Sequence, residues 1–393
     1  MDAMAEASRL TRQGRLIEAT GLIQQTLAAS AVTPLVSSSP RVEEPSGGAS
    51  PRHRASLPPP LALRGTHPMG ARSGSARRLL AVPSRSASGL DLTHKAGAPA
   101  AEPSAGRFDN FSYTNRAGTR RYRLYVPAGH AGSEPLVVML HGGTQDGATF
   151  AAATGMNAIA DKFLVAYPEQ ARSANAGKYW NWFDPRHQHR DAGEPSLIAG
   201  ITSQVIARYG VDADRVYVAG FSAGGAMAAV MAAVYPDLYQ AVGVHSGLAY
   251  ASAADVASAF TAMKQGPARP ARPLARPRPL IVFHGDRDAT VAHANAAHLI
   301  DDVLVAGGSQ RRSGNAPSAE TTAGQVPGGQ AYTRTCYPDR AGAPLAECWI
   351  IHHGGHGWSG GAPHGSYTNP HGPNAGAEFI RFFGEHPAPP SKH

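Results

Sequence analysis

The stretch RVYVAGFSAGGAMAAVMAAV, residues 215–234, contains the pattern that decides the fold. Its apolar start predicts a buried strand, and the alanine-rich run that follows predicts a helix. The link between them, GFSAGG, holds a G-x-S-x-G pattern whose glycines allow a turn too tight for larger side chains. Strand, sharp turn and helix would together present the Ser222 hydroxyl above a sheet edge, at the N-terminal end of a helix.

Apolar runs of the same kind recur along the chain. One of them, RRYRLYVP at 120–127, alternates as an antiparallel strand does. The others are nearly continuous in apolar residues, as in strands buried on both faces, and helical stretches separate them. They are LVVMLHGG (136–143), FLVAYPEQ (163–170), AVGVHSG (241–247), PLIVFHGD (279–286) and CWIIHHGG (348–355). The sequence therefore predicts an α/β domain with a mostly parallel central sheet flanked by helices.

The composition and hydrophobic patterning of the chain divide it into three parts. Residues 5–28 place apolar side chains near one stripe, which predicts a short amphipathic helix within 1–32. Residues 33–105 are rich in Ala, Ser, Pro, Gly and Arg and show no sustained periodicity. Such a segment cannot bury enough surface to offset its ordering entropy, so we predict a disordered linker. The folded domain is expected over 106–387.

Charge and composition exclude several classes of protein. The net charge is +8, and residues 1–105 hold 12 Lys and Arg against 7 Asp and Glu, which is most of the excess. Because no helix presents a basic face, nucleic-acid binding is not expected. No apolar run approaches the roughly 18 residues of a membrane span, so no transmembrane segment is expected. The N-terminus lacks the pattern of a secretory signal, and two cysteines exclude a disulfide scaffold.

A serine nucleophile needs a base, and the base needs an acid that orients it. After a serine in a strand–turn–helix motif, the acid precedes the histidine along the chain. HGDRDATV supplies Asp286 and Asp288 just after one strand, and HHGGHGWSGG supplies several histidines just after another. We select Asp288 and His356, because residues a few positions past a strand end can turn back over the sheet edge. His352 and His353 still belong to the strand or its end.

Attack on a carbonyl also needs donors for the oxyanion that forms. One is expected to be the backbone N–H of Ala223, the residue after the serine. The second is expected from the loop after an early strand, where HGGTQDG lies at 141–147. Gly143 or Thr144 would supply that N–H, while Gly142 shapes the loop.

Taken as a set, these motifs resemble the poly-hydroxybutyrate depolymerase type of esterase in the α/β-hydrolase superfamily. The similarity covers roughly residues 108–385 and includes YWNWFDP and GEPSLIAGIT in addition to the motifs above. It implies an α/β-hydrolase fold with Ser222 as nucleophile, Asp288 as acid and His356 as base. It does not settle the substrate, because relatives with this core include polyester depolymerases, feruloyl esterases and acetylxylan esterases.

Aromatic residues gather in YWNWFDP and beside the proposed base. Trp180 and Trp182 are candidates for stacking against a flat apolar or sugar-like substrate, and core packing is the alternative. Trp358 is a third candidate, and it could equally brace the loop of His356. We therefore place these three tryptophans among the expected substrate-binding residues.

The two cysteines, Cys336 and Cys348, flank a segment that reads as a hairpin turn. A disulfide across adjacent strands is geometrically allowed, and it would favour an oxidising compartment. The missing secretory signal points instead to a cytoplasmic or granule-associated protein, although relatives are often extracellular. The sequence leaves this conflict open.

The expected function is a serine esterase that forms an acyl-enzyme and needs no metal or organic cofactor. The histidines at 352, 353, 356 and 364 have no partner carboxylate or cysteine at ligand spacing, so no metal site is expected. A short-chain polyester such as poly-hydroxybutyrate is the leading substrate, and the N-terminal helix would suit attachment to a polymer granule. A feruloyl or acetylxylan esterase is the alternative enzyme. A non-catalytic granule- or polymer-binding protein with a hydrolase fold is the alternative of another class.

Overall fold

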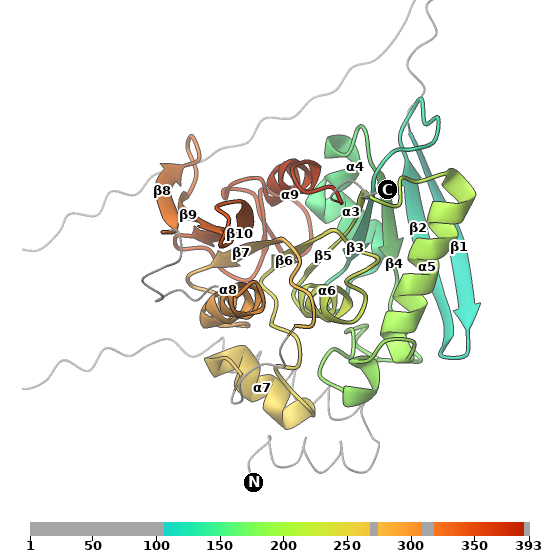
Figure 1. The fold of residues 1–393 in the computed structure, drawn as a ribbon, viewed down its shortest axis with the longest axis horizontal. Helices are drawn as coiled ribbons and strands as arrows, with labels where there is room; N and C mark the ends of the chain where they lie inside the picture. Colours follow the sequence, from blue (N-terminus) through green and yellow to red (C-terminus); the bar gives the residue numbers. More distant parts are fainter. Residues whose placement is uncertain (1–105, 268–273, 309–317, 389–393) are drawn as a thin grey trace, which may run out of the picture. The chain divides into compact units, whose positions relative to one another are not determined.

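The computed structural model describes residues 106–267, 274–308 and 318–388. The predicted helix within 1–32 and the predicted linker over 33–105 lie outside these residues. Across the described part, ten strands form one sheet with helices packed against both faces (Figure 1). This is the mostly parallel α/β architecture that the sequence predicted.

The sheet has a parallel centre and antiparallel edges. Its strand order is β1-β2-β4-β3-β5-β6-β7-β10-β9-β8. Neighbours from β4 to β10 pair in parallel, whereas β1, β2, β8 and β9 join by antiparallel pairing. The bounds are β1 (Arg107–Asn115), β2 (Gly118–Val126), β3 (Leu136–Leu140), β4 (Leu164–Pro168), β5 (Val216–Phe221), β6 (Ala241–His245), β7 (Leu280–Gly285), β8 (Glu320–Gln325), β9 (Ala331–Pro338) and β10 (Pro344–Ile351). A short pair, β11 (Trp358–Ser359) and β12 (Thr368–Asn369), lies outside this sheet.

Helices cover both faces because the central strands are apolar on both sides. The residues of α5, α6 and α8 pack in one core cluster, and those of α3, α4 and α9 pack in the other (Figure 1). Their bounds are α3 (Gly147–Thr154), α4 (Met156–Ile159), α5 (Gly193–Tyr209), α6 (Ala223–Val234), α8 (Ala294–Ala306) and α9 (Ala375–Gly384). Two further elements, the 3₁₀ turn η1 (Pro185–His187) and the helix α7 (Val256–Gln265), lie in the long connections.

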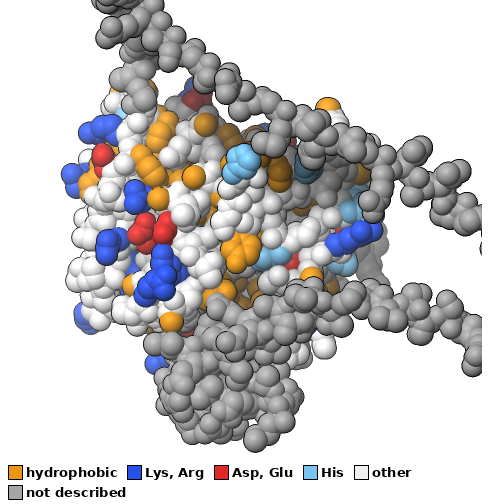
Figure 2. All heavy atoms as spheres, turned by 180° about the vertical axis from the view of Figure 1, so that it is seen from behind, with side chains coloured by type: hydrophobic (Ala, Val, Ile, Leu, Met, Phe, Trp, Pro, Cys, Tyr) orange, Lys and Arg blue, Asp and Glu red, His pale blue; other side chains and the backbone are white. Residues whose placement is uncertain are grey.

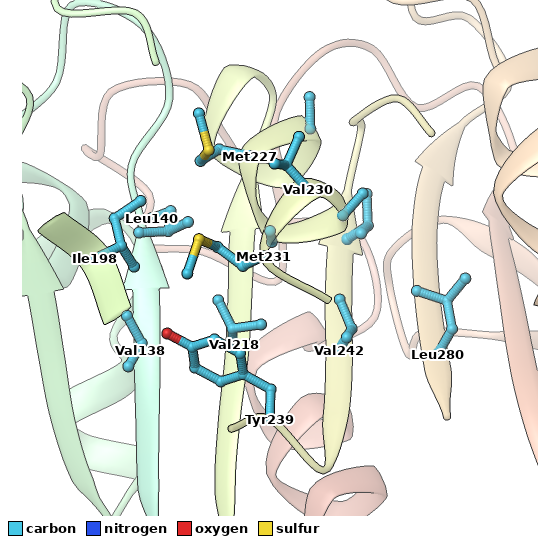
Figure 3. Packing of buried hydrophobic residues seen from close by; sticks show 14 of the residues in the cluster. Val138, Leu140, Ile198, Val218, Met227, Val230, Met231, Tyr239, Val242 and Leu280 are labelled. Carbon is cyan, nitrogen blue, oxygen red and sulfur yellow. The ribbon is translucent and has the colours of Figure 1, made fainter. Parts of the chain in front are cut away.

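Strand β3 shows how one strand serves both cores. Val138 and Leu140 pack in the cluster that includes Met231 of α6, as Figure 3 shows. The residues between them, Val137 and Met139, belong to the opposite cluster. Because side chains alternate between the faces of a strand, a run that is apolar throughout is buried on both sides.

The two cysteines form no disulfide with each other, although their spacing allowed one. Cys336 on β9 lies opposite Glu347 in the antiparallel register, and Cys348 on β10 lies opposite Thr335. Since successive residues of a strand point to opposite faces, the two sulfurs lie on opposite faces of the sheet. The two cysteines therefore give no indication of an oxidising compartment.

Few large hydrophobic side chains are exposed in the described part of the chain. None of the helices in the described residues has the length and apolar character needed to cross a bilayer. On the face shown in Figure 2, acidic side chains lie among the basic ones. In the described part of the chain, Val305 and Tyr367 are the large hydrophobic residues left exposed.

Candidate active site

Ser222 lies at the sharp turn between β5 and α6. Its backbone has φ 56° and ψ −119°, a strained conformation of the kind stored at functional sites. The turn closes because Gly220 and Gly224 carry no side chain: a Cβ on Gly220 would lie 2.3 Å from the Gly224 carbonyl carbon. The Ser222 side chain makes no capping hydrogen bond to the helix, so its hydroxyl does not act as an ordinary N-cap.

The structure brings the three side chains selected from the sequence together. His356 Nε2 lies 3.0 Å from Ser222 Oγ, and His356 Nδ1 lies 2.7 Å from Asp288 Oδ2. The Asp288 side chain is fully buried and that of His356 is 11% exposed. With Nδ1–H donating to the carboxylate, Nε2 is free to accept the serine proton. This is the geometry that a serine nucleophile requires.

Asp288 is held as a carboxylate by its surroundings. Its Oδ1 accepts hydrogen bonds from the backbone N–H of Thr290 at 2.9 Å and of Val291 at 2.8 Å. The buried His284 lies 3.5 Å from Oδ2, on the same carboxylate oxygen as His356. Burial opposes ionisation, but hydrogen bonds from His284 and His356 outweigh it and hold the pKa of Asp288 well below its ordinary value. The acid therefore stays charged beside the imidazole.

The other acid and histidines of the two motifs form a separate chain. Asp286 Oδ2 lies 3.1 Å from His352 Nδ1, and His352 Nε2 lies 2.8 Å from Thr333 Oγ1. Asp286 Oδ1 also accepts the backbone N–H of His353 at 2.7 Å. His352 and His353 thus bond to Asp286, whereas His356 bonds to Asp288. Within the described residues, no group of His, Cys, Asp and Glu side chains is arranged to hold a metal ion.

The expected oxyanion donors are only partly available. Ala223 is the first residue of α6, where helical N–H groups have no partner within the helix. The expectation for Thr144 is wrong, because its N–H donates to Gly177 O at 2.7 Å. The N–H of Gly143 makes no hydrogen bond to the described residues. Gly143 must be glycine here, since a Cβ would lie 2.0 Å from the Tyr179 ring.

Sequence reasoning missed a buried histidine that joins two parts of the site. His245 ends β6, and its carbonyl accepts the Ser222 N–H at 2.9 Å. Its ring Nε2 accepts the N–H of Ser359 at 2.9 Å, just beyond His356. Burial keeps the pKa of His245 well below its ordinary value, so the ring is neutral and can accept this bond. The available signal was a histidine near the end of the predicted strand at 241–247, the next predicted strand after Ser222 along the chain.

A buried carboxylate that was also missed holds together the segments of Gln170 and Asn181. Glu194, at the start of α5, accepts hydrogen bonds from the Asn181 backbone at 2.8 Å and from its side chain at 2.6 Å. It also accepts from Gln170, and Arg120 lies 3.6 Å away. Gln170 N–H donates in turn to the buried ring of His141, at the base of the glycine loop. Burial lowers the pKa of His141 to about 4, so this ring is neutral too.

The three tryptophans have different positions, which corrects two expectations. Trp182 is nearly buried but lines a cavity beside Ser222. Trp180 is completely buried and packs on the ring of His141, 5.5 Å between centroids. Trp358 is 1% exposed and stacks on His245 at 5.1 Å. Neither Trp180 nor Trp358 has surface left for a substrate, and Trp358 braces the loop that carries the base.

The cavity beside the serine is small and mostly apolar. Its volume is about 110 Å³, and Ser222 and Ala223 form part of its wall. The aromatic side chains of Tyr179, Trp182 and Phe183 form another part. The arrangement joins an activated hydroxyl, unpartnered backbone donors and an apolar recess, which is what acyl transfer needs.

Comparison with known families agrees with this geometry. Residues 120–327 match the family described as Esterase PHB depolymerase. The chain belongs to this family. The matched residues include Ser222 and Asp288 and end before His356.

The curated relatives in and around the family are esterases of several kinds. The chain is 35% identical to poly(3-hydroxyalkanoate) depolymerase C of Paucimonas lemoignei, over 62% of this chain and 59% of that protein. It is 37% identical to feruloyl esterase B of Neurospora crassa, over 37% of this chain and 50% of that protein. It is 33% identical to acetylxylan esterase A of Aspergillus ficuum, over 34% of this chain and 44% of that protein. The chain thus spans about half the length of these relatives.

A solved structure supports the fold. The acetyl xylan esterase from Aspergillus awamori superposes with a TM-score of 0.55 at 22% identity, over 70% of this chain and 99% of that one. At this identity the likeness concerns the fold alone.

Proposed function

We propose that this chain is a serine esterase that cleaves carboxylic esters through an acyl-enzyme on Ser222. The observation that carries the proposal is the hydrogen-bonded chain from Ser222 through His356 to the buried Asp288. Family membership supports the same activity. Together they favour an enzyme over a non-catalytic polymer-binding protein, which would have no need of this geometry.

The first half of the reaction forms the acyl-enzyme. Ser222 Oγ attacks the ester carbonyl carbon while His356 Nε2 takes the hydroxyl proton. The N–H groups of Ala223 and Gly143 stabilise the negative oxygen of the tetrahedral intermediate. His356 then gives the proton to the leaving alkoxide as the ester C–O bond breaks, and Asp288 stabilises the imidazolium in between.

The second half returns the enzyme to its starting state. Water attacks the acyl carbon, and His356 takes a proton from that water. The bond from the acyl carbon to Ser222 Oγ breaks, His356 returns the proton to Ser222, and the carboxylic acid leaves. Each step uses the same imidazole, which the buried carboxylate keeps in one orientation.

A short-chain polyester of the poly-hydroxybutyrate type is the substrate we propose. The family description and the relative from Paucimonas lemoignei support this choice. The test is to incubate the purified full chain with hydroxybutyrate oligomers, methyl ferulate and acetylated xylan, using Ser222→Ala as the blank. We expect hydroxybutyrate release at least about 10-fold faster than ferulate or acetate release. Release of ferulate or acetate alone would move the enzyme to one of the other esterase groups.

The proposal includes attachment to a polymer surface by residues 1–32. Its support is the amphipathic pattern of residues 5–28. Deleting residues 1–105 should lower activity on insoluble polymer and spare activity on a soluble short ester. Equal activity losses on both substrates, or none, would remove the attachment hypothesis.

A further inference from the structure

The direction of the Gly143 N–H, an oxyanion donor in the proposed reaction, depends on the peptide unit that carries it. Because peptide bonds are planar and trans, the Gly142 carbonyl and the Gly143 N–H point in opposite directions. The Gly142 carbonyl lies 2.7 Å from His141 Nδ1. Since the Gln170 N–H donates to Nε2 of this neutral ring, its proton lies on Nδ1 and is donated to that carbonyl. One side of the donor peptide is therefore held in place.

The other side is held by a loop from a different part of the chain, residues 175–179, which we call the bracing loop. The Gly177 carbonyl accepts the N–H of Thr144, the residue after Gly143, at 2.7 Å. The Tyr179 ring packs on Gly143 so closely that a Cβ on this glycine would lie 2.0 Å from it. Both peptide units that flank Gly143 are thus fixed, while its own N–H has no partner among the described residues.

Asn175 gives the bracing loop its shape. Its Oδ1 accepts the backbone N–H groups of Gly177 at 3.0 Å and of Tyr179 at 3.3 Å. Its side-chain nitrogen donates to Asn181 Oδ1 at 3.0 Å, and Asn181 bonds in turn to the buried carboxylate of Glu194. Asn175 is 8% exposed, so an apolar side chain in its place would leave buried polar groups without partners.

An ion pair closes the bracing loop onto the end of the glycine loop. Lys178 Nζ lies 3.2 Å from Asp146 Oδ2, while Asp146 Oδ1 accepts the Thr149 N–H as the N-cap of α3. Burial opposes ionisation of Asp146, but hydrogen bonds from Thr149 and Lys178 outweigh it and lower its pKa to about 2. The backbone of Lys178 has φ 54°, a region that non-glycine residues rarely adopt. Such strain persists only where the surrounding contacts impose it, and it is concentrated at functional sites.

We propose that the bracing loop orients the oxyanion donor of Gly143, with Asn175 and Lys178 as its positioning residues. The inference rests on the proposed esterase function, because the donor acts only when Ser222 attacks an ester. The engaged N–H of Thr144 is part of this arrangement, since it holds the residue that carries the donor. Because the oxyanion exists only after the attack, loosening the loop should lower kcat and change KM little.

The experiment compares kcat on a p-nitrophenyl ester with the inhibition constant of a trifluoromethyl ketone, whose adduct with Ser222 carries the oxyanion. Variants are made in the full chain, and the end point of phosphonate labelling counts the active sites in each preparation. Asn175→Leu should lower kcat about 30-fold, less than the loss of a whole donor, and raise the inhibition constant by a similar factor. Lys178→Met should change both about 5-fold, whereas Lys178→Arg keeps the charge and should stay close to the wild type.

Arg172→Met is the matched control for charge. Arg172 is exposed, lies on the same segment of the chain as Lys178, and makes no hydrogen bond or ion pair to the described residues. Its replacement removes the same charge as Lys178→Met without breaking a contact of the bracing loop. Its kcat and its inhibition constant should equal those of the wild type.

Asp146→Asn separates positioning by the ion pair from a direct effect of the Lys178 charge. Asparagine keeps an oxygen for the N-cap of α3 but loses the ion pair. Positioning predicts that kcat falls about as much as in Lys178→Met and that the double variant falls no further. If the lysine charge itself stabilised the oxyanion, removal of the opposing carboxylate would raise kcat.

The outcomes separate the bracing loop from the activity. Unchanged kcat and inhibition constant in Asn175→Leu and Lys178→Met, or a rise of kcat in Asp146→Asn, would overturn the proposal and leave the esterase in place. If Asn175→Leu does not fold, the variants of Lys178 and Asp146 give the answer, because both of these side chains are partly exposed. A wild type that cleaves no ester and takes up no phosphonate would instead contradict the proposed function itself.

Discussion

Two hydrogen-bonded chains of hydroxyl, imidazole and carboxylate lie at the C-terminal ends of β7 and β10. In one, Ser222 bonds to His356 at 3.0 Å and His356 to Asp288 at 2.7 Å. In the other, Thr333 bonds to His352 at 2.8 Å and His352 to Asp286 at 3.1 Å. The same three kinds of side chain thus occur twice, with acids two residues apart in the sequence.

The surroundings of the two chains differ. The side chains of His356 and Asp288 are 11% and 0% exposed, whereas those of His352 and Asp286 are 39% and 28% exposed. Ser222 precedes the free N–H groups of α6, while Thr333 lies within β9, paired with strands on both sides.

We infer that a hydrogen-bonded chain of this kind is not by itself sufficient for catalysis. The reacting hydroxyl also needs unpartnered donors for the oxyanion and an enclosed, water-poor setting in which electrostatic interactions are strong. We assign the reaction to the buried chain and a structural role to the exposed one, which joins the β8–β9 edge to the loop of Asp286.

Replacing each of the two histidines with alanine, in separate variants, should give the largest difference in kcat. His356→Ala removes the base of both half-reactions, and we expect kcat on a p-nitrophenyl ester to fall on the order of 10⁶-fold. His352→Ala removes two partly exposed hydrogen bonds, which should lower the free energy of unfolding by about 1 kcal/mol and change kcat less than about 5-fold. Steady-state kinetics and thermal unfolding of both variants measure these effects. Equal losses of kcat would contradict the different roles assigned to the two chains.

Replacing the acids Asp288 and Asp286 with asparagine should give the next largest difference in kcat. Asp288→Asn keeps the shape of the side chain but no longer fixes the imidazole tautomer, so kcat should fall on the order of 10⁴-fold. In Asp286→Asn the side-chain oxygen can still accept the His353 N–H, and we expect less than about a 10-fold change. The same kinetic assay measures both. A larger loss for Asp286→Asn than for Asp288→Asn would reverse the assignment of the acid.

A third carboxylate tests how burial without a partner affects charge. Asp302 on α8 is partly buried, and this loss of solvent, together with the charge of Asp301, raises its pKa to about 7. No hydrogen bond or ion pair from the described residues reaches it. An unfolded aspartate has a pKa near about 3.9, so between about pH 4 and 7 the folded state holds a proton that the unfolded state has lost. The free energy of unfolding should fall as the pH rises through this window.

Asp302→Asn should therefore raise the melting temperature at pH 8 and leave it nearly unchanged at pH 4. The gain should be roughly 2–4 °C for each kcal/mol recovered. Circular dichroism melts of the wild type and the variant at pH 4, 6 and 8 test this. A temperature difference that stays the same at all three pH values would show that Asp302 does not titrate in this range. The contrast between Asp288, which its partners keep charged, and Asp302, whose pKa burial raises, would then be lost.

The parts of the molecule set by local pattern were predictable from the sequence. Continuous apolar runs and the G-x-S-x-G turn lead directly to a parallel sheet and the bend at Ser222, because both depend on neighbours in the chain. The choice of Asp288 over Asp286 was also within reach, since a residue further past the strand end can turn back over the edge.

Contacts between distant segments could not be predicted from the sequence. The N–H of Thr144 is engaged only because Gly177 lies beside it, and no pattern at 141–147 shows this. The burial of Trp180 likewise follows from its packing on His141. For the cysteines, spacing permits a bond, but the strand register places the sulfurs on opposite faces, and a change of one residue in register would have put them together.

The most direct test is to treat the full chain with a serine-directed phosphonate and to locate the adduct by mass spectrometry. We expect one equivalent of label, carried by Ser222, with Thr333 unmodified and no label on Ser222→Ala. Label on Thr333 or another residue, or label that persists on Ser222→Ala, would contradict the assignment of Ser222 as the nucleophile.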